Sequence, residues 1–259
     1  MTGTGWVALV GGGPGVDGLI TARGAELLSM ADVVVMDRLA PRGLTRDLGP
    51  DVELIDVGKE VGSHAVTQTQ INRILIDKAG QGHGVVRLKG GDPYVLGRGM
   101  EEHQACAQAG IPVEVVSGVT SAIAVPAAAG IPLTHRGVAR AFTVLTGHDA
   151  VQDLPPGTDH TVVLLMGVAR LAQTMQAMSD TGREPHCPVA VVERGLLPGQ
   201  RTTVGTVQDI ARRAAAAQVS APAVIVVGDV VRLCPAWSTS HNGSKRVEGR
   251  FAAAVSSPT

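Results

Sequence analysis

Four charged residues stand directly after apolar runs that have the length and composition of buried strands. They are Asp37, Lys59, Asp92 and Arg98. If these runs pair in parallel, their carboxyl ends meet at one edge of a sheet, which is where open α/β sheets bind ligands. Any one of these residues taken alone is more often structural than catalytic. Four of them at one edge predict a ligand site that holds both carboxylates and cations.

Two of these residues belong to residues 85–102, VVRLKGGDPYVLGRGMEE, which carry two glycine turns. Asp92 follows Gly90 and Gly91, where glycine allows a positive φ and a close approach of the backbone to a ligand. Arg98 stands between two further glycines at the start of a predicted helix. An ordinary strand-to-helix connection would also contain Gly and Asp. Two such turns with charged residues so close together favour a ligand site.

The first glycine loop, GGGPG at residues 11–15, permits two interpretations. Gly13, Gly15 and Gly18 match the dinucleotide fingerprint, and Asp37 ends the next strand at about the distance of twenty residues that NAD binding requires. Against an NAD-dependent oxidoreductase, the usual register puts Val16 at the third glycine, a proline interrupts the turn, and the GGDP loop has no role. A close-packed turn without a nucleotide is equally well supported at this point.

Other classes of site and of location find little support in the sequence. The histidines show no HxxxH or HExxH spacing, and the cysteines form no CxxC pair, so no metal is expected. A GxSxG nucleophile elbow is absent. The net charge of −1 argues against nucleic acid and anionic membranes as partners. Three widely separated cysteines and a start without a signal peptide predict a reducing, cytoplasmic location.

The elements that would position these residues follow from an aliphatic core. Hydrophobic residues make up 44% of the 259 residues but aromatic ones only 2%, which suits parallel strands buried on both faces. The predicted strands are residues 6–10, 33–36, 52–57, 85–88, 113–116, 142–145, 161–166, 189–193, 202–206 and 223–227. The predicted helices are residues 19–30, 71–80, 100–110, 169–178 and 207–217. Thr67 and Gln70 have the spacing of a capping box before the second helix.

This alternation predicts an α/β fold with two α/β domains. We place the first domain at residues 1–117 and the second at 118–236, with the small-residue-rich segment SGVTSAIAVPAAAGIPLTHRG as the connection. The run 113–133 is interrupted by Gly, Pro and hydroxyl residues and does not read as a membrane span. Residues 237–259 lack periodicity and are rich in Ser, Thr and Gly, which predicts a disordered tail.

With these stretches assembled, the chain resembles the tetrapyrrole methylase family over residues 7 to about 231. The most specific motifs are LKGGDP followed by GRG, and GVTSAIAVPAAAGIPLTHR; VALVGGGPG, VVMDRL, VGKEVGSH, LTGH, VVLLMG, VVERGLLPGQR and PAVIVVGDVV accompany them in order. The departures are limited. Val16-Asp17 stand where the family usually has Asp-Pro, and Leu96, Met100 and Ser117 stand where Phe, Gly and Pro are expected.

The resemblance implies two α/β domains with a cofactor cleft between them, and a homodimer. S-Adenosyl-L-methionine would be the cofactor, leaving as S-adenosyl-L-homocysteine. Its implied contacts are Pro14, Gly90, Gly91, Asp92, Val95, Thr120, Ser121, Met166 and Gly195. The implied substrate-binding residues are Arg38, Arg98, His135 and Arg136. Asp37 carries over as proton acceptor and Lys59 as proton donor. Arg98 and Glu101, three apart at a helix start, form a competing acid–base pair on one helix face.

The activity implied by the resemblance is C-methylation of uroporphyrinogen III at two positions, through precorrin-1 to precorrin-2, for sirohaem or cobalamin synthesis. Cationic groups would pair with the eight substrate carboxylates, and one base would take a proton. The sulfonium supplies the electrophile, so no metal is needed. The alternatives are a methylase of the same fold that acts on a later corrin intermediate, on rRNA or on a protein, and, more distantly, the NAD-dependent oxidoreductase.

Overall fold

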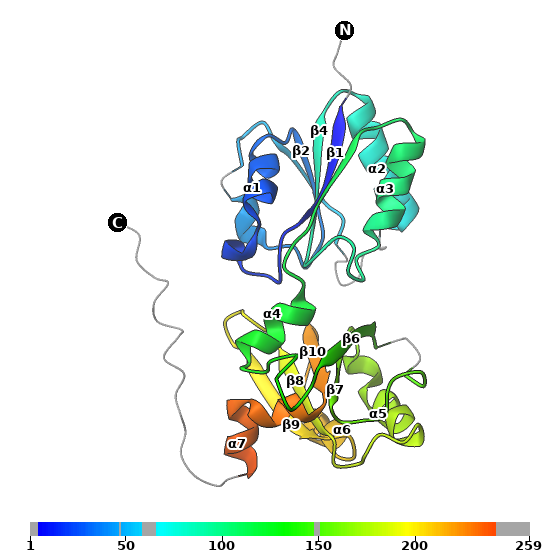
Figure 1. Cartoon of the computed structure of the whole chain (residues 1–259). Coiled ribbons are helices and arrows are strands. Elements are labelled where there is room, and N and C mark those ends of the chain that lie inside the picture. Colours follow the sequence, from blue (N-terminus) through cyan, green and yellow to red (C-terminus); the bar gives the residue numbers. More distant parts are fainter. Residues whose placement is uncertain (1–4, 47, 59–65, 148–150, 242–259) are drawn as a thin grey trace, which may run out of the picture. The chain divides into compact units, whose positions relative to one another are not determined.

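A computed structural model describes residues 5–46, 48–58, 66–147 and 151–241 of the chain (Figure 1). The chain divides into two compact units. The first comprises Met1–Ala128 and Arg194–Gln200, and the second Ala129–Glu193 and Arg201–Thr259. Each unit contains one five-stranded sheet with its own hydrophobic core. The predicted α/β class is confirmed.

The sheet of the first unit is entirely parallel, in the strand order β3-β2-β4-β1-β5. Its strands are β1 (Trp6–Gly11), β2 (Val33–Met36), β3 (Glu53–Asp56), β4 (Gly84–Lys89) and β5 (Val113–Val116). All four residues of β2 and all six of β4 are buried. Burial on both faces explains the continuous apolar runs in the sequence, because parallel sheets are covered on both sides by their crossover helices.

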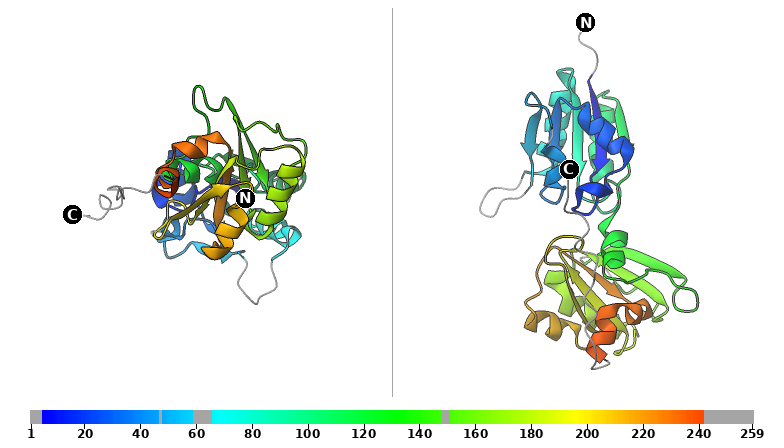
Figure 2. Two further views of the ribbon diagram at one scale, coloured as in Figure 1. Left: turned by 90° about the horizontal axis from the view of Figure 1, so that it is seen from below. Right: turned by 90° about the vertical axis from the view of Figure 1, so that its left-hand side faces the viewer.

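Helices cover the two faces of this sheet unequally (Figure 1). α1 (Ala22–Ser29) packs its Leu27 and Leu28 against one face, and the right-hand view of Figure 2 looks onto that face. α2 (Gln68–Gly80) and α3 (Gly99–Gln108) cover the other. Thr67 and Gln70 form the predicted capping box at the start of α2. The short 3-10 helices η1 (Asp17–Leu19) and η2 (Arg42–Thr45) complete the connections.

The chain changes faces at the centre of this sheet. β1 and β4 are neighbours, yet the connection that leaves β1 passes through α1 on one face and the connection that leaves β4 passes through α3 on the other. The loops at the carboxyl ends of β1 and β4 therefore diverge. Such a topological switch point is the general ligand position in open α/β sheets.

The second unit contains a mixed sheet in the order β6-β7-β10-β8-β9. β6 (Ala141–Thr146) pairs in parallel with β7 (His160–Leu165), while β8 (Pro188–Glu193), β9 (Arg201–Thr206) and β10 (Ala223–Val227) join by antiparallel pairs. The helices η3 (Val168–Arg170), α5 (Leu171–Asp180), α6 (Ile210–Ala216), η4 (Asp229–Leu233) and α7 (Pro235–His241) follow in this unit. Side chains of α5 and α6 build its core, and in Figure 1 α7 lies on the side of the sheet away from α5. No helix of the described residues is both long and apolar enough to cross a membrane.

The end of the first unit differs from the prediction. This unit extends through α4 (Ser121–Ala128) instead of ending at residue 117, and it also includes residues 194–200. Residues 194–200 join the first unit because the side chain of Leu197 lies against Gly15.

The start of the predicted tail also differs. Trp237–His241 belong to α7 and are therefore not a disordered tail. Trp237 is 9% exposed, and its ring lies under the Arg232 guanidinium. Residues 242–259 lie outside the described part of the chain.

Candidate functional site

Three glycine turns meet at the carboxyl ends of β1, β4 and β5 so closely that their backbones touch. Gly13 and Gly91 exchange two backbone hydrogen bonds of 3.2 and 2.7 Å. A Cβ atom on Gly118 would lie 2.2 Å from the carbonyl oxygen of Gly91, and one on Gly11 would lie 2.5 Å from the backbone nitrogen of Gly118. We call this arrangement the glycine cradle: Gly11, Gly13, Gly91 and Gly118. A side chain at Gly11 or Gly118 would force the turns apart.

Gly91 has a φ of +68° and marks the open side of the cradle. A Cβ atom there would make only ordinary contacts, 3.7 Å from Thr120 Cα and 3.8 Å from the backbone nitrogen of Ser121. Ser121 is the first residue of α4, and Thr120 Oγ1 accepts a hydrogen bond of 3.3 Å from the backbone of Ala122. The open side of the cradle therefore lies against the start of α4, where the positive end of the helix dipole suits polar or anionic ligand groups.

The Asp92 carboxylate links two turns of the glycine cradle. Its carboxylate accepts hydrogen bonds from the backbone nitrogens of Tyr94, at 2.8 Å, and Gly118, at 3.0 Å. The side chain therefore ties the turn after β4 to the turn after β5. It keeps further lone pairs for a ligand, since a carboxylate can accept about four hydrogen bonds.

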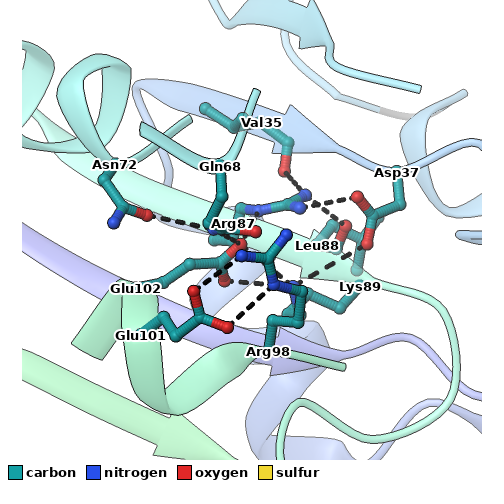
Figure 3. Close-up of polar contacts among 10 residues, drawn as sticks. All are labelled: Val35, Asp37, Gln68, Asn72, Arg87, Leu88, Lys89, Arg98, Glu101 and Glu102. Carbon is teal, nitrogen blue, oxygen red and sulfur yellow. Dashed lines mark hydrogen bonds and ion pairs between the residues drawn. The ribbon is translucent and has the colours of Figure 1, made fainter. Parts of the chain in front are cut away.

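Asp37 lies at the same edge and is held by a buried cation (Figure 3). The Arg87 Nη2 atom of β4 donates to Asp37 Oδ1 at 2.5 Å. The Arg87 side chain is 2% exposed and that of Asp37 33%. Asp37 Oδ2 lies 3.9 Å from Lys89 Nζ, beyond hydrogen-bond distance. One oxygen is thus fixed from inside the protein, and the carboxylate remains partly accessible.

Behind Asp37 the charges continue into the protein interior. Glu102 of α3, fully buried, accepts from Arg87 Nε at 3.1 Å, from Lys89 Nζ at 3.0 Å and from Gln68 of α2 at 3.1 Å. We call Asp37, Arg87, Lys89 and Glu102 the buried ion network. Its two carboxylates balance its two cations. Burial, reinforced by the neighbouring Arg87, lowers the pKa of Lys89 despite its carboxylate partners.

Arg98 and Glu101 form an exposed pair at the start of α3 (Figure 3). The Arg98 guanidinium binds both carboxylate oxygens, at 2.8 and 2.7 Å. Hydrogen bonding from Arg98 lowers the pKa of Glu101, and the charge of Lys89 contributes in the same direction. Arg98 itself adopts a left-handed φ of 55° as the residue before α3. A carboxylate engaged in this way is a weaker base than a free one.

The remaining predicted residues are distributed between the two units. Pro14, Gly90, Val95 and Gly195 belong to the first; Gly90 packs on the backbone of Leu39 and Gly195 on Val125. Arg38 is exposed next to Gly58. Lys59 lies outside the described residues.

In the second unit, Met166 is 54% exposed and has a φ of +57°, a strained value for a residue with a side chain. His135 and Arg136 are both exposed and line a pocket together with Thr134, Gly137, Ala139 and Arg140. Backbone hydrogen bonds between His135 and Ala139 close this loop. Within the described ranges no group of three or more His, Cys, Asp or Glu could hold a metal ion.

A family model described as Tetrapyrrole (Corrin/Porphyrin) Methylases matches residues 7–211, most of both units. The chain belongs to this family. The predicted resemblance is confirmed, and the interpretation of the first glycine loop as a dinucleotide fingerprint gives way to it. In this chain the first glycine turn pairs with the GGDP turn through Gly13 and Gly91, so both loops belong to one arrangement.

Similar proteins point the same way. An S-adenosyl-L-methionine-dependent uroporphyrinogen III methyltransferase of Methanosarcina barkeri is 46% identical over 237 residues, covering 88% of this chain and 93% of the relative. A siroheme synthase of Sodalis glossinidius is 46% identical, but the match covers only 50% of that protein. The crystal structure of uroporphyrin-III C-methyl transferase from Thermus thermophilus complexed with S-adenyl homocysteine is 39% identical, with a TM-score of 0.75, covering 88% of this chain and 99% of that one.

The buried ion network is the part of this methylase that the sequence analysis missed. The sequence analysis assigns Arg87 to a predicted strand and Glu102 to a predicted helix, and it gives no role to either residue or to Lys89. A signal was present, because two cations at alternate positions of one strand point to the same face, and a buried face requires counter-charges.

Proposed function

We propose that this protein catalyses the S-adenosyl-L-methionine-dependent C-methylation of uroporphyrinogen III at two positions, giving precorrin-2. The observation that carries the proposal is the 46% identity to a uroporphyrinogen III methyltransferase over 93% of that relative's length. The glycine cradle supports it, because it lies at the topological switch point, where open α/β sheets bind ligands, and Gly91 leaves its open side free of side chains.

In this proposal the glycine cradle binds the cofactor, whose sulfonium supplies an electrophilic methyl group. Pro14, Gly90, Gly91, Asp92, Val95, Thr120, Ser121 and Gly195 of the first unit hold it, and Met166 stays a predicted contact. Cofactor binding is supported by the solved relative that contains S-adenyl homocysteine. Asp92 keeps the cradle closed through the backbones of Tyr94 and Gly118.

The substrate's reacting carbon is nucleophilic, so the protein's tasks are orientation and proton removal. A new carbon–carbon bond forms to the methyl carbon as the carbon–sulfur bond breaks, and S-adenosyl-L-homocysteine leaves. The ring then loses a proton from the adjacent bridge carbon to the Asp37 carboxylate. Lys59 donates a proton, and Arg38, Arg98, His135 and Arg136 pair with substrate carboxylates. We further propose a cytoplasmic homodimer.

Anaerobic incubation of the purified protein with uroporphyrinogen III and S-adenosyl-L-methionine tests the proposal. We expect a product that carries two additional methyl groups, and two equivalents of S-adenosyl-L-homocysteine per product. Cofactor turnover with a later corrin intermediate, while uroporphyrinogen III keeps its mass, would instead assign the chain to another reaction of the family. Binding of NAD in place of S-adenosyl-L-methionine in a calorimetric titration would contradict both.

A further inference from the structure

The alternation of side chains along two neighbouring strands places Arg87 behind Asp37. In β4, Val85, Arg87 and Lys89 share one face, and Val85 packs into the core beneath α2 and α3. In the neighbouring β2, Val35 pairs with Arg87, and Asp37 follows one step further on the same face. On this face of the sheet the residues at the start of the strands are apolar. Those at the carboxyl ends, next to the candidate site, are charged.

Arg87 uses its whole guanidinium in this position. Nε donates to Glu102 and Nη2 to Asp37, while Nη1 lies 3.3 Å from the carbonyl oxygen of Val35 and 3.4 Å from that of Leu88. Glu102 is in turn fixed by Lys89 and by Gln68. The planar fork of an arginine therefore has a single orientation, and that orientation sets where the Asp37 oxygen lies.

Stability alone does not account for such an arrangement. A buried ion pair gains little over well-packed apolar side chains, because each charge loses its hydration. Here the only partly exposed member of the buried ion network is Asp37, at the sheet edge. The network is thus oriented toward one accessible carboxylate.

We propose that Arg87 is a positioning residue for the Asp37 carboxylate, and that Glu102 holds Arg87 in the required orientation. The proposal rests on the proposed function, in which Asp37 accepts the substrate proton. Fixing Oδ1 from inside leaves Oδ2 as the oxygen that receives the proton, in a defined direction. The charged groups that face Asp37 are Arg87 and Lys89 from β4 and, behind them, Glu102 from α3; Gln68 from α2 is neutral.

The first test needs no turnover. The carboxyl carbon of Asp37 is followed by ¹³C NMR in the free protein as pH is lowered, with its signal assigned by its loss in Asp37→Asn. We expect the titration midpoint in Arg87→Met to lie about one pH unit or more above that of the wild type, because a carboxylate that loses a cationic neighbour binds its proton more tightly. Arg87→Lys keeps a cation, so the titration midpoint of Asp37 should rise less in this variant. If Arg87→Met does not fold, Arg87→Lys is used for the test instead.

Arg183→Met is the matched control, because Arg183 is equally buried but lies in the second unit and donates to the carbonyl oxygen of Pro155. It removes a buried guanidinium that makes no contact with the buried ion network and should leave the Asp37 midpoint unchanged. An unchanged midpoint in both Arg87 variants, or an equal shift in Arg183→Met, would overturn the proposal.

The second test is a double-mutant cycle on turnover. We expect Arg87→Met to lower kcat at least tenfold with KM within about twofold of the wild type, and to cause no further loss when Asp37 is already Asn. Equal losses in both backgrounds would show that Arg87 does not act through Asp37. If the wild-type protein does not methylate uroporphyrinogen III, the proposed function fails, and the NMR titration still decides whether Arg87 controls Asp37.

Discussion

Asp37 and Glu101 differ in the hydrogen bonds that their carboxylate oxygens accept. Both oxygens of Glu101 accept hydrogen bonds from the Arg98 guanidinium, which lowers the pKa of Glu101. Only one oxygen of Asp37 accepts a hydrogen bond from Arg87, and the Asp37 side chain is one-third exposed. The second oxygen of Asp37 is therefore the better candidate for accepting a proton, whereas the Arg98–Glu101 pair presents a guanidinium that is fixed but accessible.

We expect Asp37→Asn to lower kcat and kcat/KM together by about 10² to 10⁴, with little change in KM, because the proton transfer occurs in the transition state. Steady-state kinetics under anaerobic conditions, with product mass as readout, measure this. Glu101→Gln should retain much more activity. The base assignment moves to Glu101 if the two results are reversed.

Arg98→Ala should act mainly on substrate binding. Its guanidinium is exposed at the start of α3 and already oriented by Glu101, so it can pair with a substrate carboxylate. We expect KM for uroporphyrinogen III to rise about tenfold or more while the affinity for S-adenosyl-L-homocysteine, measured by calorimetry, stays unchanged. A fall in kcat at unchanged KM would argue instead for a role in the chemical step.

At the scale of elements, the glycine cradle shows how far the site follows from local sequence. The strands, the turns after them and the capping box at Thr67 follow from apolar runs, glycines and spacing, and the structure confirms them. Contacts between the turns could not be predicted, because they depend on the strand order, which brings β1 between β4 and β5. The salt bridges of Arg87 depend in the same way on residues far away in the chain.

Gly118→Ala tests the cradle as a unit. Its Cβ would meet only backbone atoms, the nearest at 2.2 Å, so the turns after β1, β4 and β5 must separate. We expect the affinity for S-adenosyl-L-homocysteine to fall by about tenfold or more, the equivalent of roughly 1.4 kcal/mol. Gly80→Ala is the control, because a Cβ at Gly80, the last residue of α2, meets nothing within 4 Å. Unaltered affinity in Gly118→Ala would contradict a cofactor site at the cradle.

A cross-strand pair in the second sheet gives a prediction of pH dependence. Glu193 of β8 faces Arg201 of β9, and hydrogen bonds from the Arg201 side chain, and from the backbone of Ser220, lower the pKa of Glu193. A lowered folded-state pKa stabilises the protein above the unfolded value of about 4.5, and that stabilisation is lost as pH falls. Glu193→Gln should thus be less stable than the wild type at pH 7. Urea unfolding at pH 7 and pH 4 should show the difference shrinking; a constant difference would contradict the linkage.

At the scale of the whole molecule, the sequence identified two α/β halves but not where the first one ends. Composition marks residues 117–137 as a connection, whereas the structure assigns α4 to the first unit. The error over Trp237 has a different cause. The segment from Trp237 shows no repeating apolar pattern, and a single large side chain that docks on its own cannot be found by periodicity.

Truncation separates the two parts of the predicted tail. Deleting residues 242–259 should leave the melting temperature unchanged, as their composition predicts. Trp237→Ala should lower the free energy of unfolding by about 3 kcal/mol, because it empties a buried site and removes the contact with Arg232. Thermal unfolding followed by circular dichroism measures both. Equal melting temperatures for Trp237→Ala and the wild type would show that α7 does not support the second unit.

The alternating face of β4 also bears on how the chain avoids folding errors. A shift of β4 by one residue against its neighbours would turn Arg87 and Lys89 toward Leu27 and Leu28 of α1, away from Glu102. Two cations would then be buried without counter-charges, at a cost of several kcal/mol for each. A purely aliphatic strand would tolerate such mispairing far better. The same charges that lie behind Asp37 therefore disfavour the shifted alignment of β4.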